Sequence, residues 1–264
     1  AGGIFVFYDA YAVAEVVRMK ASYKNLLTVA ALVVCCLVFL ALTYFAYTHT
    51  ARTAAAQAVV QPQVLLDAGH GGEDGGTVGR SAMPEKDINL DIAKRLEQKL
   101  TEQGCQVFMT RNEDVMLGDS SLSTIRERKV SDLHKRLEIL QAHPDALFIS
   151  IHQNHFSDGV YSGAQVFYSQ NNPESLSLAE SVRSAIVTFI QPENKRQNKP
   201  AGKSIYLLWN AQTPAVLVEC GFLSNASEAA LLNQEAYRQK MADAIASGTL
   251  SYIQEKRGQN GEGT

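Results

Sequence analysis

"VLLDAGHGGEDGG", residues 64–76, joins a short apolar run to a histidine that lies among glycines and two acids. Val64 to Asp67 has the length and composition of a buried strand. The glycines that follow allow a sharp turn that would aim a ring nitrogen of His70 into a cavity. The segment lacks the GxGxxG order and the GK[ST] ending of nucleotide loops, which argues against a phosphate site. A histidine that only satisfies its own loop is the alternative.

Outward from this segment, strand-like apolar runs alternate with segments of helical period. The runs lie at 64–67, 107–110, 147–152, 164–168, 205–208 and 215–220, and the helical segments at 88–103, 125–142 and 174–190, with further helices closing the chain. "LFISI" and "AVLVE" lack polar alternation, as strands buried on both faces do. We therefore predict an α/β fold with a mostly parallel central sheet and helices on both of its faces.

A second apolar segment precedes this domain. From Leu26 to Tyr47 the sequence has no charged residue, and as a helix this stretch would reach ~33 Å, enough to cross a bilayer. Arg18, Lys20 and Lys24 precede it, so the positive-inside bias predicts one N-terminal transmembrane helix in the cell membrane, with the folded domain extracytoplasmic. The alternative is a signal sequence cleaved near the alanines at 54–58, which would leave the protein secreted.

These features divide the chain into five parts. We expect a cytoplasmic N-terminus at 1–25, the transmembrane anchor or signal sequence at 26–47, a linker at 48–62, the folded domain at 63–256 and a disordered tail at 257–264. Because "MKASYK" reads as a basic start before a membrane segment, translation is expected to begin at Met19, which leaves residues 1–18 untranslated. The net charge of the chain is near neutral, at −3, and we expect no nucleic-acid partner.

Residues with metal-binding or acid–base chemistry follow three of the predicted strands. His70 lies just beyond the first, His152 terminates "ALFISIH", and Glu219 terminates "AVLVE". Because chemistry gathers at the carboxyl ends of parallel strands, these side chains are expected to lie close together. Glu85, where a helix starts, would complete the two-histidine, one-carboxylate set of hydrolytic zinc sites. Its alternative role is favourable charge at the helix N-terminus.

Glu219 has a different role from the three ligand candidates. An acid at the end of an apolar strand is expensive to bury as an anion unless a cation or a proton is close. Near a metal it can act as a general base, and an ion pair with Arg126 is the alternative.

Several segments together carry a family resemblance. "LLDAGHGGEDGG", "EKDINL", "TR" at 110–111, "LFISIHQNH" and "PAVLVECGFLSN" resemble the zinc-dependent N-acetylmuramoyl-L-alanine amidases of bacterial cell walls, over about residues 63–255. Carried over by motif, the metal ligands are His70, Glu85 and His152, with one Zn²⁺ per chain, and Glu219 is the catalytic acid and base. The resemblance implies that residues 63–256 cleave the amide between N-acetylmuramic acid and L-alanine in peptidoglycan.

Longer matches, among them "TIRERKVSDLHKR" and "IYLLWNAQTPAVLVECGFLSN", are similar to the germination-specific members of spore-forming bacteria. Those members make the muramic-lactam of the spore cortex together with a deacetylase. The resemblance therefore implies cortex peptidoglycan as substrate and a deacetylase that acts in sequence. Cell-wall binding repeats of the kind common in related amidases are not seen in this sequence, so membrane anchoring or an activating partner protein is expected to bring the enzyme to its substrate. Asp67, Asn154, His155 and Arg126 are expected to orient the ligands or to meet the substrate.

Two other functions stay open from the residues. One is a zinc peptidase that cuts within the stem peptide, and the other is a non-catalytic wall-binding protein on the same fold. Retention of all four metal and base positions argues against the second, because a decayed site would have little reason to keep Glu219.

Overall fold

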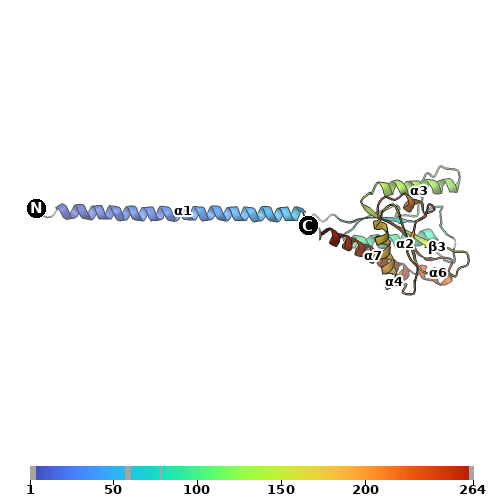
Figure 1. Cartoon of the computed structure of the whole chain (residues 1–264). Coiled ribbons are helices and arrows are strands. Elements are labelled where there is room, and N and C mark those ends of the chain that lie inside the picture. Colours follow the sequence, from blue (N-terminus) through green and yellow to red (C-terminus); the bar gives the residue numbers. More distant parts are fainter. Residues whose placement is uncertain (1–3, 57–60, 78, 262–264) are drawn as a thin grey trace. The chain divides into compact units, whose positions relative to one another are not determined.

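The computed structural model describes residues 4–56, 61–77 and 79–261, and the chain forms two compact units, Ala1–Val60 and Gln61–Thr264. The first unit contains one helix, α1, Ile4–Ala56 (Figure 1). Within it Glu15–Thr48 is long and apolar enough to cross a membrane, and its most apolar 18-residue window has a mean hydropathy of 2.9. A signal sequence near the N-terminus can meet the same criteria of length and composition.

Part of the predicted linker at 48–62 is helical. Helix α1 continues to Ala56, so residues 48–56 are helical, and residues 57–60 lie outside the described residues. The reason is local, since "TARTAAA" is rich in alanine, the residue with the highest helix propensity.

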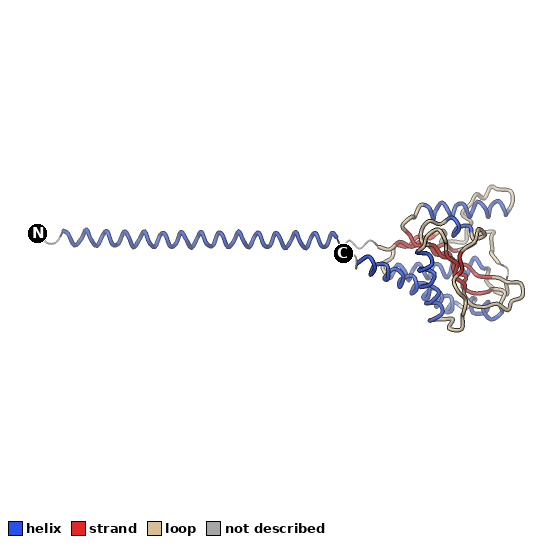
Figure 2. The backbone as a smooth tube through the Cα atoms, in the orientation of Figure 1, coloured by secondary structure: helices blue, strands red, loops and turns tan. Residues whose placement is uncertain are grey.

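The second unit is built on a six-stranded sheet with the order β2-β1-β3-β6-β4-β5. Figure 2 shows the strands of this unit in red, with helices around them. The strands are β1 Gln63–Ala68, β2 Gln106–Met109, β3 Ala146–Asn154, β4 Gln165–Tyr168, β5 Lys199–Pro200 and β6 Ala215–Phe222. β1 pairs in parallel with β2 and β3, and β3 with β6, whereas β4 runs antiparallel to β6. The predicted α/β fold with a mostly parallel sheet is confirmed.

Helices cover both faces of this sheet. They are α2 Glu85–Glu102, α3 Ile125–Gln141, α4 Glu174–Phe189, α5 Tyr206–Asn210, α6 Ala226–Leu232 and α7 Glu235–Gly261. Because successive side chains of a strand point to opposite faces, Val64 and Leu66 pack with α2, α4 and α7, whereas Leu65 packs with α3 and α5. The second unit thus has a hydrophobic core on each face of its own sheet, and we expect it to fold without α1.

Two further boundaries differ from the sequence predictions. Residues 205–208 were expected to form a strand, but Tyr206–Asn210 is the short helix α5; a brief apolar run cannot distinguish a strand from a buried helical turn. The tail at 257–264 was expected to be disordered, but α7 continues to Gly261, and residues 262–264 lie outside the described residues.

Candidate metal centre

The loop after β1 has an unusual backbone. His70 has φ 63°, and Gly71, Gly72 and Gly76 also have positive φ. The left-handed region costs an L-residue about 1–2 kcal/mol, and such strain persists where surrounding contacts enforce it. A pair of main-chain hydrogen bonds of 3.0 Å between Gly71 and Asp74 closes the turn. The glycines therefore allow a tight turn in which the histidine itself is held in a strained conformation.

Two glycines of this loop lie too close to neighbouring side chains to carry a side chain of their own. A Cβ atom on Gly69 would lie 2.2 Å from the ring of His152, which is far inside van der Waals contact. On Gly76, which already has positive φ, it would lie 2.5 Å from Oε2 of Glu85. The loop can therefore reach the end of β3 and the start of α2 only where side chains are missing.

The structure brings His70, Glu85 and His152 together. One ligand atom from each residue lies within 4.8 Å of the others. His70 Nε2 and His152 Nδ1 each lie 3.2 Å from Glu85 Oε1, and the two rings meet edge to face with centroids 4.9 Å apart. Residues that are far apart in the chain thus aim two nitrogens and one oxygen at a shared point.

Glu85 does more than favour the helix N-terminus. Its side chain is only 2% exposed. Oε2 accepts a hydrogen bond of 2.6 Å from Thr77 N, and Oε1 accepts from Gln153 N (3.1 Å) and Asn89 Nδ2 (3.3 Å). Burial alone would raise the pKa of Glu85, but the hydrogen bonds from His152 and His70 hold it well below its usual range. The carboxylate is therefore an ionised group between two imidazoles.

Asp74 joins the site although its role was not predicted. Its Oδ2 lies 2.7 Å from His70 Nδ1, and its Oδ1 lies 2.6 Å from Lys129 Nζ. Burial alone would lower the pKa of His70, but Asp74 and Glu85 raise it to about 9. A carboxylate on the second ring nitrogen fixes the tautomer of a metal-binding histidine. Its position four residues after His70, inside the same turn, was the available signal.

Asn89 was also missed, and its spacing could have predicted it. It is fully buried one helical turn after Glu85, on the same face of α2. Its amide donates to Gly69 O (3.1 Å) as well as to Glu85, and so ties the first turn of α2 to the loop.

Glu219 lies beside this cluster. It pairs in register with His152 on the neighbouring parallel strand, so the two side chains leave the sheet on the same face, from strands that lie about 4.8 Å apart. The Oε2 atom of Glu219 is buried and has no hydrogen-bond partner among the described residues. Burial raises the pKa of Glu219 to about 7, and the nearby histidines only partly offset that shift. No ion pair joins it to Arg126 within the described part of the chain.

The four residues predicted to support the site have different environments. Asp67 is buried and accepts from Thr110, Ser150 and Arg136, which hold its pKa near 2 against the effect of burial. Asn154 Oδ1 accepts a hydrogen bond of 2.8 Å from the main-chain N of His155. His155 and Arg126 are exposed. Within the part of the chain that the structure describes, only Asp67 among these four has a side chain that connects to the cluster through hydrogen bonds, by way of Arg136, which donates to His70 O at 2.6 Å.

The donor set fits a particular kind of ion. Two imidazole nitrogens and one carboxylate oxygen suit Zn²⁺, whereas Ca²⁺ and Mg²⁺ prefer oxygen ligands alone. Glu219, a buried acid with an unpaired oxygen, lies next to these three ligands, which is where a hydrolytic centre needs its base.

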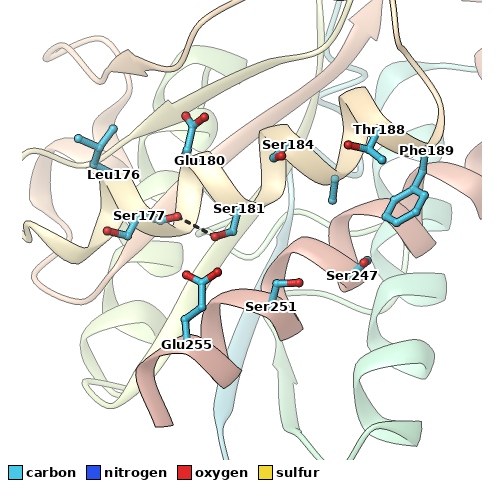
Figure 3. Close-up of a pocket in the computed structure, with 11 residues that line it drawn as sticks. Leu176, Ser177, Glu180, Ser181, Ser184, Thr188, Phe189, Ser247, Ser251 and Glu255 are labelled. Atoms are coloured by element: carbon cyan, nitrogen blue, oxygen red, sulfur yellow. Dashed lines mark hydrogen bonds between the residues drawn. The ribbon is translucent and has the colours of Figure 1, made fainter. Parts of the chain in front are cut away.

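A separate groove lies between α4 and α7 (Figure 3). Its lining includes five serines, Ser177, Ser181, Ser184, Ser247 and Ser251, and none of the ligand or base candidates. Ser181 Oγ donates to the carbonyl of Ser177 in its own helix, at 3.1 Å. Among the residues that the structure describes, no histidine lines this groove to activate a serine, so the metal cluster is the better candidate for catalysis.

An acid beside a three-ligand cation site at the carboxyl edge of a parallel sheet is typical of metal-dependent hydrolases. The comparison with family models gives the particular family. Residues 64–251 match the model for N-acetylmuramoyl-L-alanine amidase, and the chain belongs to this family of cell-wall hydrolases. The resemblance predicted from the sequence is confirmed.

Individual relatives agree with this assignment. The chain is 38% identical over 193 residues to the germination-specific N-acetylmuramoyl-L-alanine amidase of Bacillus subtilis, covering 73% of this chain and 80% of that protein. The CwlD amidase of Clostridioides difficile, solved in complex with the GerS lipoprotein, superposes with a TM-score of 0.71 and 37% identity, covering 74% of this chain and 99% of that one. An N-acetylmuramoyl-L-alanine amidase from Clostridium difficile 630 gives a TM-score of 0.63 at 32% identity, covering 74% and 98%.

The raised pKa of Glu219 predicts a pH-dependent stability. In the metal-free domain, the folded state holds this proton up to pH about 7, whereas the unfolded chain releases it near the ordinary value of 4.5. The folded state therefore binds more protons between these values, and its stability falls as pH rises through that window. Glu219→Gln removes this pH dependence. The free energy of unfolding of the variant, relative to that of wild type, should therefore increase from pH 4.5 to 7, by at most about 3 kcal/mol.

Urea unfolding of residues 61–264 in the presence of a chelator, at half-unit pH steps, measures this difference. Glu193→Gln removes the same charge at an exposed position and serves as the control. A constant difference between Glu219→Gln and wild type across the window would contradict the burial of this carboxyl group.

Proposed function

We propose that the chain is a zinc-dependent amidase that cleaves the bond between N-acetylmuramic acid and L-alanine in peptidoglycan. One observation supports this most directly: the ligand atoms of His70, Glu85 and His152 lie within 4.8 Å of one another, beside the unpaired carboxyl oxygen of Glu219. The three residues would hold Zn²⁺, and Glu219 would be the catalytic acid and base.

A bound zinc ion supplies a Lewis acid and a water of lowered pKa. Asp74 accepts the Nδ1 proton of His70, which leaves the Nε2 lone pair directed at the centre. Glu219 takes the proton of the attacking water, because its Oε2 has no competing donor. The same carboxyl group then returns that proton to the departing nitrogen of L-alanine, since an expelled amide anion would be far too basic. A neighbouring cation favours the ionised form of Glu219 needed for the first transfer.

Substitutions separate the two roles. Glu219→Gln should keep about one zinc per chain and slow turnover by roughly 10²- to 10⁴-fold, because only the proton transfer is lost. His70→Ala should lose both zinc and activity. Metal analysis of the purified domain, and release of peptides beginning with L-alanine from peptidoglycan, measure the two quantities.

Glu193→Gln, which changes an exposed glutamate, should behave as wild type. Full activity in a zinc-free, chelator-treated preparation would contradict the mechanism. Products cut between stem amino acids would instead indicate the peptidase alternative.

We further propose that the substrate is the peptidoglycan of the spore cortex. The support is the similarity to the germination-specific amidase of Bacillus subtilis. Amide cleavage exposes the lactyl carboxyl group of muramic acid, and a deacetylase acting in sequence would free the amine with which it closes the lactam. Spores that carry Glu219→Gln should therefore lack muramic-lactam in their cortex. Normal lactam content, measured by muropeptide chromatography, would exclude this role.

A partner protein belongs to this proposal as well, because the CwlD amidase of Clostridioides difficile was solved in complex with the GerS lipoprotein. We propose that this chain also works with an activating partner. The zinc and turnover assays test the need for a partner. An isolated domain that binds a full equivalent of zinc and turns over at its maximal rate needs no partner protein.

We propose that α1 anchors the enzyme as a single-pass membrane protein with the amidase domain outside the cell membrane. The uncharged segment Leu26–Tyr47 and the basic residues before it support this placement. The full chain should stay in the membrane fraction through high-salt washing, and protease added outside should remove the domain. A mature protein in the wall fraction that begins within residues 54–59 would show signal cleavage instead.

A further inference from the structure

Two buried arginines hold the main chain of the loop that carries His70. Arg111 and Arg136 are 3% and 2% exposed. Arg111 donates from Nε to Ala68 O (2.8 Å) and from Nη2 to Gly69 O (3.0 Å). Arg136 donates from Nη1 to Ala68 O (2.9 Å) and from Nη2 to His70 O (2.6 Å). Three consecutive carbonyls therefore accept hydrogen bonds from guanidinium groups.

Arg111 reaches a second ligand segment as well. Its Nη2 also donates to Lys86 O at 2.9 Å, and Lys86 directly follows Glu85 in the first turn of α2. Nη1 donates to Glu113 O at 3.0 Å, in the loop after β2. One rigid side chain thus spans the loop of His70 and the helix start that carries Glu85.

The two arginines differ in how their charge is balanced. Arg136 pairs with Asp67 Oδ1 at 2.5 Å and with Asp132 Oδ2 at 2.6 Å. Among the described residues, no carboxylate accepts a hydrogen bond from Arg111, whose partners are all main-chain carbonyls. A buried cation without a direct counter-ion is weakly stabilising at best. Its presence at this position therefore calls for a role other than stability.

We propose that Arg111 is a positioning residue of the metal centre, which fixes the separation of His70 and Glu85 through main-chain hydrogen bonds to both of their segments. This inference rests on the proposed zinc site. Lysine cannot replace Arg111, because one ammonium on a flexible stem lacks the planar fork that reaches four carbonyls at once.

The experiment uses the full chain in detergent, stripped of metal. Arg111→Lys keeps the charge, and Arg111→Met keeps the length of the stem without charge. Zn²⁺ affinity is measured by competition with a chromophoric chelator, and ligand geometry by the visible absorption of bound Co²⁺. Both variants should bind Zn²⁺ roughly 10- to 100-fold more weakly than wild type, and the Co²⁺ spectrum should lose the intensity of a tetrahedral site.

Arg238→Lys is the matched control. Arg238 is also buried, at 7% exposure, and it joins α7 to Asp91 of α2 and to Leu232 O rather than to the metal loop. This variant should lower the melting temperature while leaving Zn²⁺ affinity and the Co²⁺ spectrum unchanged.

Wild-type Zn²⁺ affinity in both Arg111 variants would overturn the inference, and so would an equal loss in Arg238→Lys. Failure of both Arg111 variants to fold, judged by circular dichroism, would make Arg111 a requirement of the fold and would also overturn it. A wild-type chain that binds neither metal would instead refute the proposed zinc function.

Discussion

The buried carboxylate of Glu85 is the constraint on which the rest of the site depends. An anion that is 2% exposed is tolerable only when donors or cations surround it. Those groups come from three places: the loop after β1, the end of β3 and the first turn of α2 itself. The fold therefore has to bring these segments together before the ligand set exists, and the sheet order that places β1 beside β3 does so.

The strained loop is stabilised from outside its own sequence. Asp114 accepts from Gly72 N at 2.7 Å, and Lys86 Nζ donates to Gly72 O at 2.8 Å. Together with the two arginines, these contacts restrain the main chain from Ala68 to Gly72. Such restraint suits a metal centre, because ligands that are already in position lose little conformational entropy when a cation binds.

Much of this arrangement could be predicted from residue patterns. His70, His152 and Glu219 were predicted to meet because each follows an apolar strand, and parallel strands present their carboxyl ends at one edge. The predictions failed where the pattern was short or the partner distant. Residues 205–208 gave too few positions to distinguish a helix from a strand. Arg126 was predicted to support the site, but Arg111 and Arg136 are the arginines that contact the loop of His70. Sequence spacing does not show which arginine side chains turn inward.

The sequence by itself determined the alternating α/β order, the uncharged N-terminal helix and the identity of the ligand and base candidates, since these depend on local composition, periodicity and motif. Only the tertiary structure decided which atoms meet. The unpaired oxygen of Glu219 and the carbonyl contacts of Arg111 both depend on segments separated in the chain. Packing across the sheet fixes the geometry of these contacts, and a local sequence pattern carries no information about that packing.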